Sequence, residues 1–204
     1  MKKIIYVYIL NAMADWELGY VMSAVSMEIN DEYCIKTVAC NKNTITTLGG
    51  FKIIPDCSVE EIDESNMKAL LIPGGDTWGN PEHEEILSRV RGYLEKGILV
   101  GAICGATLSL ANLGILNEYL HTSNSKEYLK LFSKKYTGEE LYKDKLAVRD
   151  RNLVTGSSAG SLLWAKEILQ YLNVFSNEII EAWYNYYLTG DPKYYLEMLA
   201  LSNN

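Results

Sequence analysis

The feature that most constrains the fold is an alternation of short apolar runs with longer segments of helical periodicity. The apolar runs are rich in β-branched and aromatic residues and short enough for buried strands; they occupy residues 3–10, 34–40, 68–72, 98–103 and 152–155. The segments of helical periodicity occupy residues 16–29, 82–96, 105–113, 125–134 and 158–172. This alternation predicts a doubly wound α/β fold, in which helices cover both faces of a mostly parallel sheet.

Two further segments fall outside this alternation. Residues 44–56 read as a β-hairpin with its turn at Gly49 and Gly50. Two short aromatic-rich helical patterns, separated by a turn at residues 189–192, follow the last strand and helix. We therefore expect an α/β domain over residues 1–175 and a C-terminal helical extension over 176–204 that packs on it. The aromatic residues of the extension could instead cover a pocket or form a subunit contact.

Charge and cysteine content limit the classes of partner. The net charge is −7 and the 19 Lys and Arg residues are scattered, which argues against nucleic acid and against an anionic membrane surface. The apolar start of the chain reads as a buried strand rather than a secretion signal. The four cysteines lack the C-x-x-C spacing of zinc sites or redox pairs, so we expect free thiols in the cytoplasm. No dinucleotide or phosphate motif and no metal-ligand cluster is present, so the sequence predicts no cofactor and no metal.

Cys104 stands at the junction of an expected strand and an expected helix, within the stretch ILVGAICGATLSLA. Small residues flank it, as a nucleophile elbow requires, because such an elbow holds its central residue in a strained conformation at the carboxyl edge of the sheet. The positive end of the following helix favours the thiolate and predicts a lowered pKa. The alternative is a buried structural cysteine.

Two other segments end at the same edge of the expected sheet. In LLIPGGDTW, a strand is followed by Gly74, Gly75 and Asp76, and the amides of Gly75 and Gly105 would together form an oxyanion hole. In NAMADWELGY, Glu17 would face the cysteine from the first turn of a helix and tune its proton affinity. Read in isolation, the glycines are a plain turn, and Glu17 and its neighbour Asp15 are helix-start acids.

Taken together, the ADWE segment, the strand ending in PGG, the AICGAT elbow, the AxLGIL helix end, the HTSN segment and the DRNLVTGSSAG segment resemble the ThiJ/PfpI family. The resemblance covers about residues 3–172 and implies a flavodoxin-like sandwich, a homodimer and a reactive cysteine. It assigns the nucleophile or redox-sensitive thiol to Cys104, its acid partner to Glu17, and the oxyanion amides to Gly75 and Gly105. The same resemblance places this family within the class I glutamine amidotransferase-like superfamily.

Departures from the family pattern separate the candidate activities. Peptidase members place a histidine directly after the cysteine, where this chain has Gly105, and glutaminase members use a late histidine and glutamate that this chain lacks. Other members carry a histidine in the strand after the elbow helix; here Asn124 aligns with it and His121 lies three residues earlier. If HTSN is a strand, side-chain alternation lets only one of these two residues face the crevice. Residues 157–160 replace the arginine segment by which some members bind anions.

We therefore expect a cysteine-dependent enzyme that acts on a small-molecule substrate, a reactive carbonyl compound or its adduct, as a glyoxalase or deglycase does. Cys104 would attack to give a hemithioacetal, and Glu17 would carry the proton. Asp15, Gly74, Asp76, His121 and Asn124 are further candidates for the pocket. One alternative is a non-catalytic oxidative-stress sensor or chaperone-like protein with an oxidisable Cys104. Another is an amidase or peptidase that takes a histidine from a partner subunit.

Overall fold

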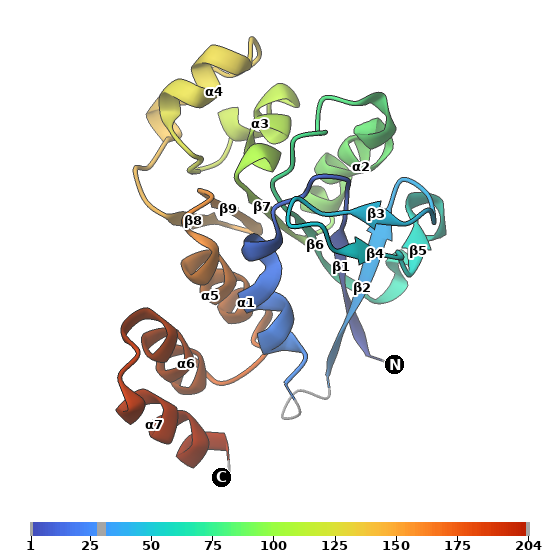
Figure 1. The fold of residues 1–204 in the computed structure, drawn as a ribbon. Coiled ribbons are helices and arrows are strands. Elements are labelled where there is room, and N and C mark those ends of the chain that lie inside the picture. Colours follow the sequence, from blue (N-terminus) through green and yellow to red (C-terminus); the bar gives the residue numbers. More distant parts are fainter. Residues whose placement is uncertain (1, 28–31, 203–204) are drawn as a thin grey trace.

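The computed structural model describes residues 2–27 and 32–202, which form one seven-stranded sheet with helices on both faces (Figure 1). The strand order is β5-β2-β1-β6-β7-β9-β8, and every neighbouring pair is parallel except β8 and β9. The strands of this sheet are β1 (Lys3–Tyr8), β2 (Tyr33–Ala39), β5 (Cys57–Ser58), β6 (Met67–Ile72), β7 (Leu99–Ile103), β8 (Ala147–Asp150) and β9 (Leu153–Gly156). The predicted doubly wound α/β fold is confirmed.

The helices divide between the two faces of the sheet (Figure 1). The α-helices are α1 (Asp15–Val25), α2 (Glu84–Glu95), α3 (Gly105–Asn112), α4 (Lys126–Phe132), α5 (Ser161–Leu172), α6 (Asn177–Thr189) and α7 (Pro192–Ser202). Helices α1 and α5 pack side by side on one face, and α2 and α3 pack against β7 on the other. Short 3-10 helices lie at η1 (Val59–Glu61), η2 (Glu64–Asn66), η3 (Pro81–His83), η4 (Ile115–Asn117) and η5 (Glu139–Leu141).

The core lies between the sheet and these two helical layers. The central strands β1, β6 and β7 are buried almost throughout, as expected for parallel strands covered on both faces. Gly101 in β7 shows how tightly the sheet packs against α5, because a Cβ on Gly101 would lie 2.8 Å from both Leu71 of β6 and Trp164 of α5. This dense packing fixes the carboxyl ends of β1, β6 and β7, where the candidate residues stand.

The structure corrects several expected boundaries. The hairpin is present as antiparallel β3 (Ile45–Thr46) and β4 (Lys52–Ile53). Helix α1 ends at Val25, earlier than expected, and the positions 28–29 of that prediction lie outside the described residues. Helix α5 begins at Ser161 because residues 157–160 form a turn closed by the Gly160 amide on the Ser157 carbonyl. The sequence analysis missed β8, a four-residue edge strand that is too short and polar to give a strong pattern.

Helices α6 and α7 lie at the lower left of Figure 1, away from α3. The buried indole of Trp183 in α6 packs edge-to-face on Tyr20 of α1, with ring centroids 6.2 Å apart, and Tyr187 packs on the same ring at 5.2 Å. The aromatic residues of this segment therefore contact the middle of α1. The division of the chain at residue 175 stays a prediction.

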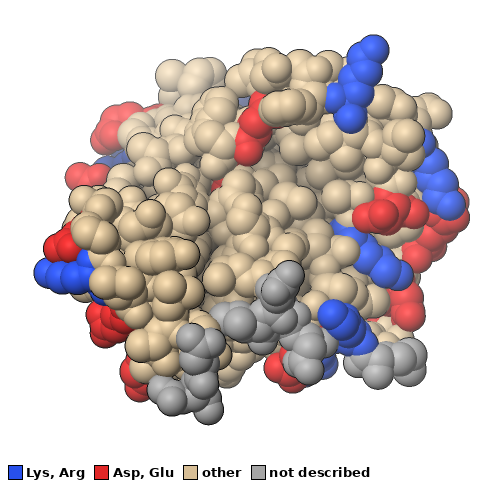
Figure 2. Space-filling model, turned by 60° about the horizontal axis from the view of Figure 1, so that its bottom comes forward, with Lys and Arg blue, Asp and Glu red and all other residues tan. Residues whose placement is uncertain are grey.

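The surface carries mixed charge. On the face in Figure 2, Lys and Arg side chains are interspersed with Asp and Glu around the edge and do not form a basic stripe. Over residues 2–27 and 32–202, no helix is long and apolar enough to cross a membrane.

Candidate active site

Cys104 sits in a sharp turn between β7 and α3. Its backbone has φ 56° and ψ −124°, a strained conformation for a residue other than glycine. The turn is held on both sides, because the Cys104 amide donates to the Gly156 carbonyl at 2.9 Å and the Thr107 hydroxyl donates to the Cys104 carbonyl at 2.6 Å. The Cys104 side chain is partly exposed. The sequence analysis expected this elbow, and the backbone has its geometry.

Glu17 reaches the cysteine because the turn after β1 docks on the loop after β6. The Ala14 amide donates to the Gly74 carbonyl at 3.0 Å, and Met13 forms an isolated antiparallel bridge with Gly75. This pairing places the first turn of α1 against the elbow. The Glu17 side chain is fully buried, and its Oε2 accepts a 2.5 Å hydrogen bond from the Gly74 amide.

Gly74 packs against both candidate catalytic side chains. A Cβ at this position would lie 2.9 Å from both the Cys104 Sγ and the Glu17 Oε1. That Oε1 is buried and has no conventional hydrogen-bond partner among the described residues. The free carboxylate oxygen and the sulfur therefore lie on the same side of Gly74, and the thiol is the nearby group that can exchange a proton with Glu17.

The proton affinities of the two groups are coupled. Burial raises the pKa of Glu17, although the Gly74 amide and Cys104 partly offset that effect. Burial also raises the pKa of the Cys104 thiol, and the Glu17 carboxylate raises it further, whereas hydrogen bonds from Asn124 and the Gly105 amide lower it. The expected lowered pKa of Cys104 is therefore wrong. Desolvation of the thiol and the neighbouring carboxylate outweigh the effect of the short helix on the pKa of Cys104.

The Asn124 side chain also contacts the Cys104 sulfur. Its Nδ2 donates to the Cys104 Sγ at 3.4 Å, and its Oδ1 accepts from the Ser158 amide at 2.8 Å. The Ser158 carbonyl in turn accepts from the Trp16 indole at 3.2 Å. This chain fixes the orientation of the Asn124 amide. The sequence analysis missed Ser158 and Trp16, because contacts through a loop carbonyl leave no residue-type signal.

Both histidines are buried away from the sulfur. His121 contacts the Tyr119 carbonyl at 2.7 Å and the Tyr136 hydroxyl at 2.8 Å, and burial lowers its pKa. His83 contacts the Tyr8 hydroxyl at 2.8 Å and the Thr77 hydroxyl at 3.2 Å. The HTSN segment is not a strand; only an isolated bridge joins His121 to Tyr142. Of the pair at this segment, Asn124 faces the cysteine and His121 belongs to the core, although strand alternation is not the reason.

Asp15 lies beside the site without facing the sulfur. Its Oδ2 accepts a 2.6 Å hydrogen bond from the Gly49 amide at the tip of the β3–β4 hairpin. Asp15 therefore ties the hairpin to the start of α1. Among the residues that the structure describes, no group of three or more His, Cys, Asp or Glu side chains is placed to hold a metal ion.

A cavity of about 290 Å³ opens next to the elbow along the first turns of α3. Both expected oxyanion glycines border it, and a Cβ on Gly105 would lie 3.5 Å from the Gly75 amide nitrogen. The cavity is lined by Gly75, Asp76, Trp78, Gly79, Gly105, Leu108, Ser109, Asn112 and Tyr128. A small molecule in this cavity would lie against the backbone of both glycines.

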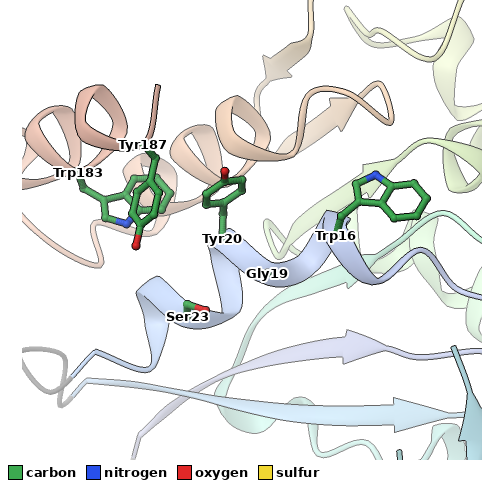
Figure 3. Close-up of a pocket in the computed structure, with 6 residues that line it drawn as sticks. All are labelled: Trp16, Gly19, Tyr20, Ser23, Trp183 and Tyr187. Atoms are coloured by element: carbon green, nitrogen blue, oxygen red, sulfur yellow. The ribbon is translucent and has the colours of Figure 1, made fainter. Parts of the chain in front are cut away.

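A larger cavity, of about 400 Å³, lies between α1 and α6 (Figure 3). Its lining is mostly aromatic, has hydroxyl groups on Tyr20, Ser23 and Tyr187, and contains no cysteine or carboxylate. The lining residues are Trp16, Gly19, Tyr20, Ser23, Trp183 and Tyr187. Size alone does not make it the reactive site, because the nucleophile candidate and its carboxylate lie at the elbow.

Comparisons with known proteins identify similar chains and a shared fold. The model of the DJ-1/PfpI family matches residues 3–171. The uncharacterized protease YoaZ of Bacillus subtilis is 40% identical over 98% of this chain and 97% of its own length. The crystal structure of a ThiJ/PfpI family protein from Bacillus anthracis superimposes with a TM-score of 0.93 at 38% identity, covering 100% of this chain and 99% of that one. A DJ-1 superfamily protein from Agrobacterium tumefaciens gives a TM-score of 0.82 at 28% identity, covering 94% and 100%.

Proposed function

Because the chain belongs to the DJ-1/PfpI family, we propose that it is a cysteine-dependent enzyme acting on small reactive carbonyl compounds or their adducts. Cys104 is the nucleophile and Glu17 is its general base. The observation that carries the proposal is the position of the buried Glu17 carboxylate. Its Oε1 has no hydrogen-bond partner among the described residues and lies, like the Cys104 sulfur, on the side of Gly74 where a Cβ would stand. A carboxylate so placed accepts the thiol proton as the sulfur attacks.

The first step joins the sulfur to the carbonyl carbon. The S–H proton passes to Glu17, the C=O π bond becomes an oxyanion, and the proton returns to that oxygen to give a hemithioacetal. The amides of Gly75 and Gly105 stabilise the oxyanion, and Asn124 keeps the sulfur oriented. In a 2-oxoaldehyde, a proton shift between the two carbons then gives a thioester, which water hydrolyses to a 2-hydroxy acid and the free thiol.

Two alternatives make different demands on the site. A redox sensor needs a reactive thiolate, whereas burial and Glu17 raise the pKa of Cys104. A peptidase or amidase has the support of the relative's name, which contains the word protease. It needs a general acid that protonates the leaving amine, and both histidines of this chain have their ring nitrogens on other groups.

The test is consumption of methylglyoxal by the purified protein. Cys104→Ser and Glu17→Gln abolish turnover, whereas Cys34→Ser, which changes a partly exposed cysteine in β2, retains it. Unchanged turnover in Cys104→Ser overturns the proposal. Negligible turnover in the wild type, together with a stable gain of two oxygens at Cys104 under mild peroxide, establishes the sensor instead.

A further inference from the structure

The cavity beside the elbow has a chemical character that the proposed reaction does not require. Its carboxylate is Asp76, which is exposed in the loop after β6. Two of its walls are aromatic, the buried ring of Trp78 and the half-buried ring of Tyr128. Among the described residues, no Lys or Arg lines it. A carboxylate beside aromatic faces is the arrangement by which proteins hold organic cations.

The walls of this cavity are held in place by the fold. The Trp78 indole donates to the Pro73 carbonyl at 2.9 Å and lies against the ring of Tyr8, with centroids 5.5 Å apart. Tyr128 packs on Phe132 of the same helix, with centroids 5.4 Å apart. The two aromatic faces are therefore preformed, and a ligand does not have to order them.

The cavity lies next to the residue that carries the reactive atom. Gly105, the residue directly after Cys104, borders it, and so does Gly75 of the loop that packs on the elbow. Tyr128 lies within electrostatic range of the sulfur, since the charge of Cys104 adds to burial in raising the pKa of the Tyr128 phenol. A molecule that is bonded to the Cys104 sulfur and enters this cavity would have its remaining atoms beside the two rings and Asp76.

We propose that the cavity beside Cys104 is a cation subsite, in which Asp76 and the rings of Trp78 and Tyr128 select substrates that carry an ammonium or guanidinium group distal to the reacting carbonyl. This inference rests on the proposed function and names its substrate class. Substrates with a distal carboxylate or phosphate are disfavoured, because Asp76 repels them and no basic side chain in the lining compensates.

The experiment measures charge selectivity at the sulfur without requiring turnover. The full-length protein reacts in separate runs with cationic 2-(trimethylammonio)ethyl methanethiosulfonate and with anionic 2-sulfonatoethyl methanethiosulfonate, and peptide mass spectrometry follows each cysteine. In both reactions the thiolate forms a mixed disulfide and methanesulfinate leaves. The ratio of the two rates cancels the thiol pKa, because both reagents use the same thiolate.

The cation-to-anion ratio is expected to be higher at Cys104 than at Cys34. In Asp76→Asn, a nearly isosteric change at an exposed position, the ratio at Cys104 falls about threefold to tenfold at low ionic strength. Asp191→Asn, in the loop between α6 and α7, removes an equal charge at a distance and leaves the ratio unchanged.

Three results overturn the subsite. They are equal ratios at Cys104 and Cys34, a Cys104 ratio that survives Asp76→Asn, and a Cys104 that neither reagent labels. These results are separate from failure of the proposed function, because an inactive protein can still show charge selectivity at Cys104. An active one can likewise lack that selectivity.

Discussion

Gly74 offers the sharpest perturbation of the proposed Cys104–Glu17 pair. In Gly74→Ala the new methyl would lie 2.7 Å from the Cys104 Cβ and 2.9 Å from both the sulfur and the Glu17 Oε1, whereas ordinary contacts begin at 3.4 Å. The side chains of Cys104 and Glu17 must therefore move away from the new methyl group by about 0.5 to 0.7 Å. Overpacking of this kind costs about 1–3 kcal/mol of stability, and a displacement approaching 1 Å at reacting groups lowers the rate about 100-fold.

The same loop supplies the control. Gly79→Ala adds the same methyl where nothing lies within 4 Å, so its effect on stability stays within about 0.5 kcal/mol. Urea unfolding gives the stability of both variants, and methylglyoxal turnover per folded molecule gives the effect on the site. If Gly74→Ala keeps the stability and the turnover of the wild type, then Gly74 does not pack against Cys104 and Glu17 as described, and the geometry of the proposed pair is wrong.

Three further predictions concern single side chains. Asn124→Ala removes the amide that lowers the pKa of Cys104, so the pH midpoint of iodoacetamide alkylation rises; an unmoved midpoint contradicts the contact. Glu17→Gln raises stability in urea at pH 7, because burial raises the folded-state pKa of Glu17 and its ionisation costs stability as pH rises above about 4.3; the gain should vanish below pH 4. His121→Ala costs about 1–3 kcal/mol by leaving Tyr136 unpaired in the core. The rate of Cys104 alkylation in His121→Ala should match that of the wild type. A large change in this rate would show that His121 acts on the cysteine.

The sheet and its helices could be predicted because their signals are local. Each central strand is a mostly apolar run, and the helix after β7 begins with a glycine followed by an alanine. The antiparallel strand β8 escaped prediction because its pairing with β9 is set by a two-residue turn at Arg151, whose φ is 52°. The residue of this turn with a positive φ is an arginine. Arginine, unlike asparagine or glycine, gives no sequence signal for that backbone conformation.

The proximity of the candidate residues was predictable from the sequence, but their electrostatics were not. Cys104, Glu17 and Gly74 follow three strands that end at one edge, so their proximity follows from the topology. The pKa of Cys104 is raised first by burial of the thiol itself and then by the neighbouring Glu17 carboxylate, and no local sequence pattern encodes either effect. The hydrogen bonds from Asn124 through Ser158 to Trp16 join two loops to the first turn of α1. Only the assembled fold brings these three segments together.

The central claim is that Glu17 accepts the proton of Cys104, and one paired measurement tests it most directly. The pH dependence of iodoacetamide alkylation at Cys104 and the rate of methylglyoxal turnover are compared in the wild type and in Glu17→Gln. Removing the carboxylate lowers the pKa of the thiol, so the alkylation midpoint should shift to lower pH while turnover is lost. Coincident midpoints, or a variant that keeps its turnover, would contradict the role assigned to Glu17.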